Sequence, residues 1–226
     1  MVSILKKHYR KKFDAAKPKT IEDYYQLITE VFEPRVVNSV FDSSTAGAFI
    51  LSLATYHDKK FNQIAKGIVK ENPVELSNAM QKIRIDQKIA ENTRLIKGIP
   101  EKLYQQITNA VVKANKIVGY DQASLSREMH QLITEDLNLC FNKASTRAKL
   151  IARDQTNKTI SILTETRHRE IGITKYEWLG VDDERERESH LENNGKIFHY
   201  DDPPETGHPG QDYNCRCTQL GIFEAS

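Results

Sequence analysis

Cysteine is scarce in this chain, which has three among 226 residues. Three are too few for a scaffold held together by disulfides. The first twelve residues carry charges but no apolar segment of the kind that a signal peptide needs, so we expect no secretory signal. We therefore expect the chain to fold in a reducing cytoplasm, where disulfides are rare.

Long hydrophobic runs are missing as well. The chain has no stretch of about 18 consecutive apolar residues, so we expect no membrane span and no membrane partner. A Gly-rich phosphate-binding loop and a nucleophile elbow are also absent from the sequence. The sequence therefore has neither of two easily recognised signatures of nucleotide-binding enzymes and hydrolases.

The composition of the chain is polar, with 38% hydrophobic and 28% charged residues. Such values are typical of amphipathic helices, which bury one stripe and expose the rest of their surface. Helical spacing of apolar residues dominates residues 20–172, whereas short β-rich segments and turns follow. We predict a mostly α fold with an elongated helical N-terminal region and a small α+β C-terminal domain, residues 173–226.

Charge is distributed unevenly along the chain. Residues 1–70 carry a net charge of +5 (12 Lys and Arg against 7 Asp and Glu), and residues 71–174 carry +4 (16 against 12). Residues 175–226 carry −7 (5 against 12). An acidic end domain would repel a phosphate backbone, so any nucleic acid should meet the other end of the chain.

Residues 1–19 form a basic N-terminal segment, which we predict to be an arm. Its positive charge offers a contact for double-stranded DNA or for an acidic partner. The other interpretation is a solvated chain terminus without a binding role. The candidate contact residues are Lys6, Lys7, Arg10, Lys11 and Lys12.

Local signals predict where the helices begin and end. Thr20, with Asp23 three residues later, favours a helix start. The run Asn72-Pro73-Val74-Glu75 predicts another start, since Asn caps well and Pro suits the first helical position. Gly98 and Pro100 are expected to interrupt the helix that follows.

A last long helix is predicted from about Thr146 to Gly172. Its middle contains the polar run Arg153-Asp154-Gln155-Thr156-Asn157. A solvated helix face is one interpretation of this run. The alternative is that Arg153 and Asn157, adjacent on the helix surface at four-residue spacing, contact the end domain.

The end domain holds residue types that bind metals. His190, His208, Cys215 and Cys217 are the ligand types of a tetrahedral zinc site, and a domain of about 50 residues gains from such a link. Two cysteines one residue apart point to opposite sides of an extended strand, so a turn would have to bring them together. The alternative is a pair of buried thiols with hydrogen-bonded histidines.

A charged cluster accompanies these residues. Asp182, Arg187, His190 and His208 could serve a metal-dependent nuclease or another phosphoryl-group enzyme. We favour a structural role, because acidic residues surround the arginines and buried Arg side chains are usually paired. The predicted structural ion-pair cluster is Asp182, Arg185, Arg187 and Arg216, and we predict no catalytic residue.

The chain carries an ordered set of motifs: Trp178, Asp182, Arg185, Arg187, His190, Gly195 and Cys215-Arg216-Cys217, preceded by Ile151-Ala152-Arg153 and Asn92-Thr93-Arg94-Leu95-Ile96. This ordered set resembles the phage Mu protein F-like family of minor head proteins. The resemblance covers roughly residues 92–220 and leaves residues 1–70 outside it. Asp154 stands where the family often has Thr or Ser followed by Glu.

This resemblance implies a role in head morphogenesis. Members are similar in being packaged at low copy inside the procapsid in association with the portal protein. Some are also associated with DNA, which they follow on ejection. It implies portal, major capsid or scaffolding partners, and a location in the capsid interior near the portal after assembly in the host cytoplasm.

Overall fold

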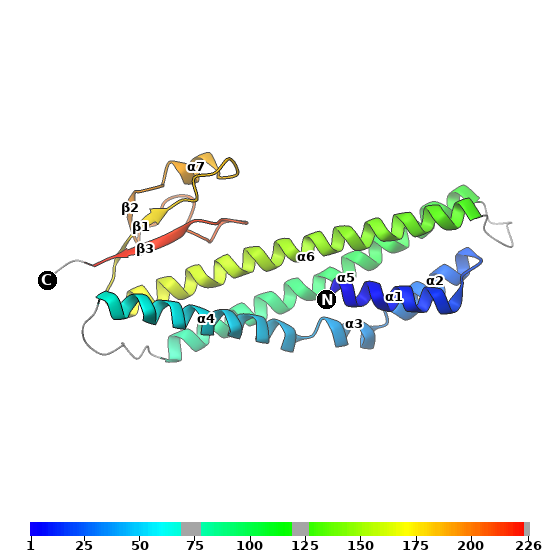
Figure 1. The fold of residues 1–226 in the computed structure, drawn as a ribbon, viewed down its shortest axis with the longest axis horizontal. Coiled ribbons are helices and arrows are strands. Elements are labelled where there is room, and N and C mark those ends of the chain that lie inside the picture. Colours follow the sequence, from blue (N-terminus) through cyan, green and yellow to red (C-terminus); the bar gives the residue numbers. More distant parts are fainter. Residues whose placement is uncertain (69–77, 119–126, 224–226) are drawn as a thin grey trace. The chain divides into compact units, whose positions relative to one another are not determined.

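The structure is a computed structural model that describes residues 1–68, 78–118 and 127–223 (Figure 1). Its elements are α1 (Val2–Ala16), α2 (Ile21–Val31), α3 (Pro34–Val40), α4 (Ser43–Ile68), α5 (Asn78–Val118), α6 (Arg127–Glu170), β1 (Lys175–Leu179), α7 (Glu188–Leu191), β2 (Ile197–His199) and β3 (Thr218–Ile222). The predicted fold class, mostly α with a small α+β domain at the C-terminus, is confirmed.

The chain divides into two compact units. Unit 1 consists of Met1–Thr45 and Thr93–Ile151, and unit 2 consists of Ala46–Asn92 and Ala152–Ser226. The long helices α5 and α6 each contribute residues to both units. The end domain belongs to unit 2 together with the C-terminal part of α6.

Unit 1 incorporates the segment that we expected to be a basic arm. Residues 2–16 form α1, whose Val2, Leu5 and Tyr9 are buried. The Tyr9 ring packs against Phe141 of α6 at 5.4 Å between centroids. Burial of this apolar face explains why the basic segment is a packed helix instead of a solvated terminus.

Helix α2 begins where the sequence predicted. The Thr20 hydroxyl accepts a hydrogen bond from the Asp23 backbone N–H at 3.1 Å, and the Asp23 carboxylate accepts one from the Thr20 N–H at 2.9 Å. This reciprocal pair is a capping box. Two backbone donors that a helix start leaves without partners are thereby satisfied.

Replacing Thr20 with alanine should therefore destabilise the protein by about 1 kcal/mol, because the variant cannot form the cap hydrogen bond. The measurement is the urea unfolding midpoint followed by circular dichroism. Thr29→Ala is the matched control, since Thr29 is an exposed residue inside the same helix. Equal destabilisation of the two variants would contradict the capping role.

Pro100 does not end a helix, contrary to the sequence prediction. Helix α5 runs through it as one continuous helix from Asn78 to Val118. Residues on both sides of the proline, Ile96, Ile99 and Leu103, are buried in unit 1. Their burial compensates for the backbone hydrogen bond that proline cannot donate. The predicted start at Asn72 lies outside the described residues.

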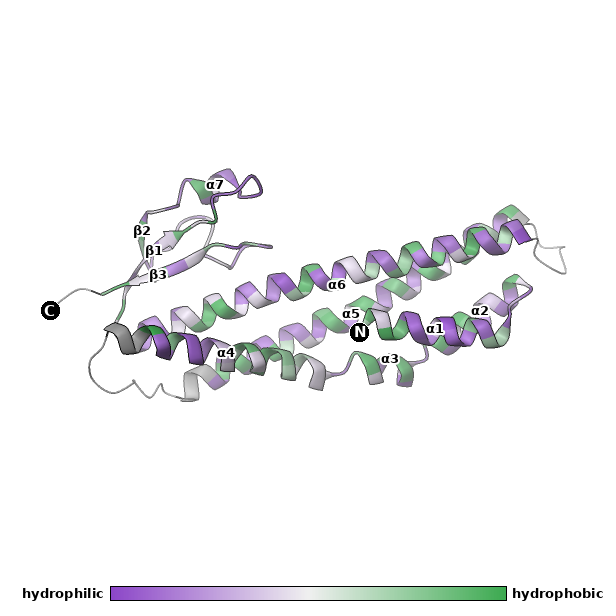
Figure 2. Ribbon diagram, viewed as in Figure 1, coloured by the Kyte–Doolittle hydropathy of each residue, from purple (hydrophilic) through white to green (hydrophobic). Residues whose placement is uncertain are grey.

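Helix α6 is also longer than predicted. We expected a helix from about Thr146, but α6 extends over 44 residues from Arg127 to Glu170. Figure 2 shows hydrophobic and hydrophilic residues interspersed along its whole length. Buried Ile133, Leu137 and Phe141 continue the apolar stripe on the N-terminal side of Thr146.

The end domain is built on a three-stranded antiparallel sheet in the order β2-β1-β3. The alternation in Lys175–Leu179 predicts an edge strand. A strand does form over these residues, but it is the central strand of the sheet, with Tyr176 and Trp178 buried. The small core adds Ile173, Tyr200, Cys215 and Cys217. Strand β3 starts at Thr218, so both cysteines precede the strand.

One described stretch passes a length and composition test for a membrane span. Pro34–Ile64, which includes α3 and most of α4, covers 31 residues. The core helix of a globular domain passes the same test, and Ile50 and Ala54 of α4 are buried. The lack of a continuous apolar run in the sequence therefore did not exclude a helix of this kind. One such helix is weak evidence for a membrane span.

Candidate functional site

A short helix and a loop of the end domain bring His190, Cys215 and Cys217 together. Helix α7 carries His190, and the segment before β3 carries both cysteines. Asn214 adopts a left-handed conformation with φ of 53°, which turns the chain immediately before Cys215. Because Cys215 to Cys217 lie outside a strand, both sulfurs can face the same point.

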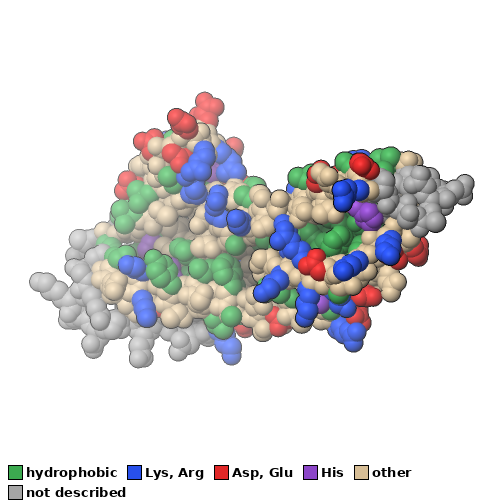
Figure 3. Space-filling model, turned by 45° about the vertical axis from the view of Figure 1, so that its right-hand side comes forward, with side chains coloured by type: hydrophobic (Ala, Val, Ile, Leu, Met, Phe, Trp, Pro, Cys, Tyr) green, Lys and Arg blue, Asp and Glu red, His purple; other side chains and the backbone are tan. Residues whose placement is uncertain are grey.

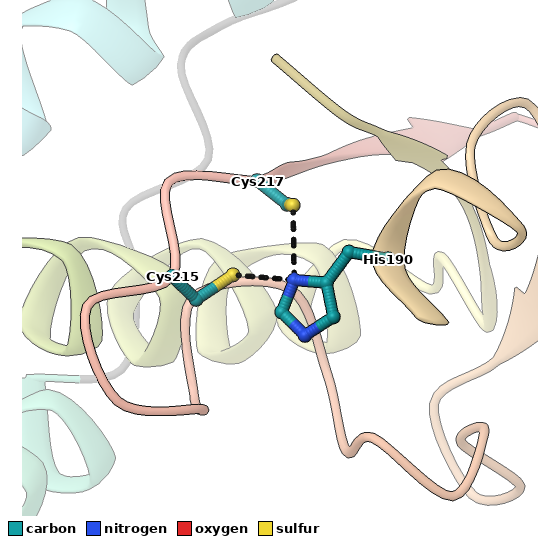
Figure 4. Close-up of side chains that lie close together, drawn as sticks. All are labelled: His190, Cys215 and Cys217. Atoms are coloured by element: carbon teal, nitrogen blue, oxygen red, sulfur yellow. Dashed lines mark hydrogen bonds between the residues drawn. The ribbon is translucent and has the colours of Figure 1, made fainter. Parts of the chain in front are cut away.

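The three side chains are buried and close. The His190 Nδ1 atom lies 3.5 Å from the Sγ atom of Cys215 and 3.5 Å from that of Cys217 (Figure 4). Their exposed fractions are 2%, 3% and 5%. All three ligand atoms lie within 4.8 Å of one another, as the donors of a single metal ion must.

Polar groups surround this cluster on several sides. The His190 Nε2 atom faces Asp212 Oδ2 at 3.4 Å, and the Gly210 N–H donates to the Cys215 sulfur at 3.3 Å. The Cys217 sulfur lies 3.1 Å from Glu186 Oε1. Contact with Cys217 lowers the pKa of the Cys215 thiol below its ordinary value, and the same contact raises the pKa of Cys217.

The space at the cluster is small. A cavity of about 20 Å³ is lined by His190, both cysteines and neighbouring charged residues. Such a volume holds about one water molecule or one ion. It offers no room for a nucleotide, so these residues do not line an open substrate cleft.

His208, the fourth residue of the predicted metal set, is held elsewhere. Its Nδ1 atom is hydrogen-bonded to the Tyr176 hydroxyl at 3.0 Å, and its ring packs against Tyr176 and Tyr200. Burial lowers its pKa. His208 thus belongs to an aromatic cluster in the core of the end domain and does not join His190.

The ion-pair cluster forms, but around a different carboxylate from the one predicted. Arg216 binds both oxygens of Asp183, with one contact at 2.6 Å, and this arginine holds the pKa of the Asp183 carboxyl well below its usual range. Arg185 pairs with the same carboxylate at 3.4 Å, although its side chain is largely exposed. Asp183 therefore takes the place assigned to Asp182.

Asp182 and Arg187 have other roles. Asp182 lies exposed in the turn after β1 with φ of 55°, and its backbone N–H donates to Glu186 Oε2. Arg187 donates to the Tyr213 carbonyl at 2.6 Å and pairs with Asp212 at 3.3 Å. Arg187 and His190 share Asp212 as a partner, whereas Asp182 and His208 have partners elsewhere, so the four residues of the nuclease hypothesis do not converge on one point.

The polar run in the middle of α6 contacts the end domain. Asn157 donates to the Cys215 carbonyl at 2.8 Å, and Asp154 accepts from the Asn214 N–H at 2.8 Å. Ser161 donates to the Pro209 carbonyl and accepts, through its own carbonyl, from Gln219 at 2.7 Å. The docking hypothesis was right for Asn157.

Arg153, its predicted companion, is exposed, and the buried Asp154 makes the contact in its place. Asp154 also pairs with Lys158 at 3.0 Å. Sequence reasoning missed Asp154 and Asp212 in these roles. The sequence contained only a weak indication of these roles. Acidic residues are common in this region, and only their contacts in the folded protein show which of them matter.

The candidate DNA contacts lie on α1. Lys7, Arg10 and Lys11 are exposed. Lys6 donates to Asn142 at 3.3 Å, and Lys12 pairs with Glu30 at 3.1 Å. The exposed three share one helix face through their spacing of three and four residues. The end domain differs in charge, and Figure 3 shows its Asp and Glu side chains in red.

Comparison with known proteins gives a family for more than half of the chain. A family model described as "Phage Mu protein F like protein" matches residues 101–220. A Haemophilus influenzae protein, described as uncharacterized, is 41% identical over 142 residues. Those residues make up 62% of this chain but 30% of that relative. No solved structure matches this chain.

Proposed function

This chain belongs to the family of phage Mu protein F-like proteins, which are phage head morphogenesis proteins, and we propose that it is a minor component of the procapsid held there by the portal. The observation that carries this proposal is the extent of the family match. It begins in α5, includes α6 and ends in β3, so the shared unit is the long helix with its docked end domain.

The internal bonding of the end domain supports an assembly role. Its charged side chains are joined to one another, as in Arg216–Asp183, and its polar backbone groups are joined to α6, as in Asn157–Cys215. Such bonding gives a rigid surface for a protein partner. The proposed partners are the portal protein and, around it, major capsid or scaffolding proteins.

Purified procapsids provide the test. The chain should be present at far lower copy than the major capsid protein, and chemical cross-linking should join it to the portal protein. Particles assembled without portal protein should lack the chain. The proposal fails if procapsids do not contain the chain, or if they contain it equally with and without the portal.

We further propose that α1 contacts packaged double-stranded DNA through Lys7, Arg10 and Lys11. Deleting the segment would remove buried Val2 and Leu5, so substitutions test the interaction better. The triple variant Lys7→Ala, Arg10→Ala, Lys11→Ala should weaken duplex binding. It should also reduce the slope of log affinity against log salt by roughly 2 to 3, about one for each phosphate that is no longer neutralised.

A second triple variant controls for the change in net charge. Lys59, Lys60 and Lys102 are exposed on other helices, and their replacement by alanine removes the same charge. It should leave the salt slope near that of the original protein. Equal slopes for both triple variants would show that α1 does not bind the DNA.

A further inference from the structure

We propose that His190, Cys215 and Cys217 bind one zinc ion, with the Glu186 carboxylate as the fourth ligand. The site lies inside the end domain and is independent of any contact with portal, capsid or DNA. The ion would join α7 to the segment before β3, which are two parts of the domain that the sheet does not connect.

The separations between the ligand atoms agree with tetrahedral zinc. Zinc–nitrogen bonds of about 2.0 Å and zinc–sulfur bonds of about 2.3 Å place nitrogen and sulfur roughly 3.5 Å apart at the tetrahedral angle. The Nδ1 atom of His190 lies 3.5 Å from both sulfurs. Imidazole with thiolates favours zinc over calcium or magnesium, which prefer oxygen ligands.

Neighbouring groups hold the ligands as they do in known zinc sites. With Nδ1 on the metal, the opposite nitrogen of His190 carries the proton and faces Asp212 Oδ2 at 3.4 Å. A carboxylate on the far nitrogen fixes the ring and raises its basicity. The Gly210 N–H at 3.3 Å from the Cys215 sulfur would stabilise the negative charge of a thiolate.

Glu186 contacts one of the three ligands and is held by backbone groups, although its carboxylate does not lie within 4.8 Å of all three ligand atoms. Its Oε2 atom accepts hydrogen bonds from the Val181 N–H at 2.9 Å and the Asp182 N–H at 2.5 Å. The carboxylate is thereby fixed with Oε1 at 3.1 Å from the Cys217 sulfur. The left-handed turn at Asp182 serves this purpose, since it aims two consecutive N–H groups at one oxygen.

The end domain has space for the ion and would gain stability from binding it. The cavity of about 20 Å³ at the cluster is the size of one water molecule. In the described part of the domain, the hydrophobic core contains six buried residues on and around three short strands. Domains this small rarely bury enough apolar surface for stability, and a structural metal supplies the difference.

Metal content is the first measurement. The full chain, purified under reducing conditions without a histidine tag, should contain about one equivalent of zinc, since structural sites are normally filled. The double variant Cys215→Ser, Cys217→Ser should contain close to none. Cys140→Ser is the control and should retain the zinc, because Cys140 lies on α6 in the other unit.

Two further readouts work on protein that is already folded. Cobalt(II) in place of zinc should give the thiolate charge-transfer and tetrahedral d–d absorption bands, and Glu186→Gln should alter the d–d bands. A strong chelator should lower the thermal midpoint reported by Trp178, and added zinc should restore it. Neither reagent should act on the double serine variant.

Three results would overturn the site. The first is zinc below about half an equivalent in the unmodified protein. The second is equal zinc content in the unmodified protein and the double serine variant. The third is a Cys215–Cys217 disulfide with no response to chelator or zinc. Unchanged cobalt bands in Glu186→Gln would overturn the assignment of Glu186 alone.

Discussion

Replacing Gly210 with alanine is expected to destabilise the end domain by about 2 to 5 kcal/mol. Gly210 has φ of +84°, where an alanine costs about 1 to 2 kcal/mol. An added Cβ would also lie 2.8 Å from the Ser161 Cβ and 3.2 Å from the Asn157 carbonyl oxygen on α6. Forcing atoms into a packed contact costs a further 1 to 3 kcal/mol or so.

The loop that carries Gly210 would have to move away from α6. That movement would stretch the hydrogen bond from Ser161 to the Pro209 carbonyl and the Gly210 N–H contact with the Cys215 sulfur. Urea unfolding followed by fluorescence measures the destabilisation directly. The single tryptophan of the chain, Trp178, is fully buried in the end domain and reports on its unfolding.

Gly195→Ala is the matched control. Gly195 also has a positive φ, +75°, but an added Cβ would meet no atom within 4 Å. This variant should be destabilised only by the roughly 1 to 2 kcal/mol of a left-handed alanine. If Gly210→Ala costs no more than Gly195→Ala, close packing of the loop on α6 is not what holds the domain in place.

Acidification should destabilise unit 2 between about pH 6.5 and pH 4. Burial lowers the pKa of His57 on α4 and of His168 on α6 from 6.5 to about 4. As the pH falls below 6.5, the unfolded chain binds protons that the folded chain does not, so unfolding becomes more favourable. Each shift is worth on the order of 3 kcal/mol once the pH is below both values.

Both histidines are held in place as neutral side chains. The His57 Nε2 atom is hydrogen-bonded to the Thr164 hydroxyl at 2.9 Å, and His168 Nδ1 to the Tyr200 hydroxyl at 2.5 Å. Arg167, whose guanidinium pairs with Asp58, lies close enough to His57 to oppose a second positive charge. Protonation of His57 is thus opposed by desolvation and by charge repulsion, and protonation of His168 is opposed by desolvation.

Urea midpoints at pH 7.5, 6, 5 and 4.5 measure this effect. The variants His57→Gln and His168→Gln should each show a smaller drop in stability on acidification than the original protein, whatever their stability at pH 7.5. His199→Gln controls for the change of residue at an exposed position and should show the same drop as the original. Parallel pH profiles for all four proteins would contradict the assignment.

Local sequence patterns predicted much of the secondary structure. The Thr20–Asp23 pair located the start of α2, and alternation in Lys175–Leu179 gave the bounds of β1. These features depend on neighbours within a few residues, so a single sequence contains the information. The ordered set of residues around His190 and Cys215 was equally sufficient to indicate the family that the comparison confirmed.

Local patterns gave the wrong bounds for the long helices, because those bounds depend on contacts with residues far away in the chain. Pro100 weakens a helix wherever it stands, and only the burial of residues on either side decides that α5 continues. Burying the polar run at residues 153–157 would be unfavourable without hydrogen-bond partners, and the backbone groups of the end domain provide those partners. Both outcomes depend on residues far away in the chain.

What the sequence by itself determined is the class of most segments: helices within residues 20–172, a small α+β domain after them, and the ligand types His and Cys in that short domain. The tertiary structure decided which of those side chains meet. It selected Asp183 over Asp182, placed His208 with Tyr176, and gathered His190 with both cysteines. Residue type follows from the sequence, but distance follows from how turns such as Asn214 fold the chain back on itself.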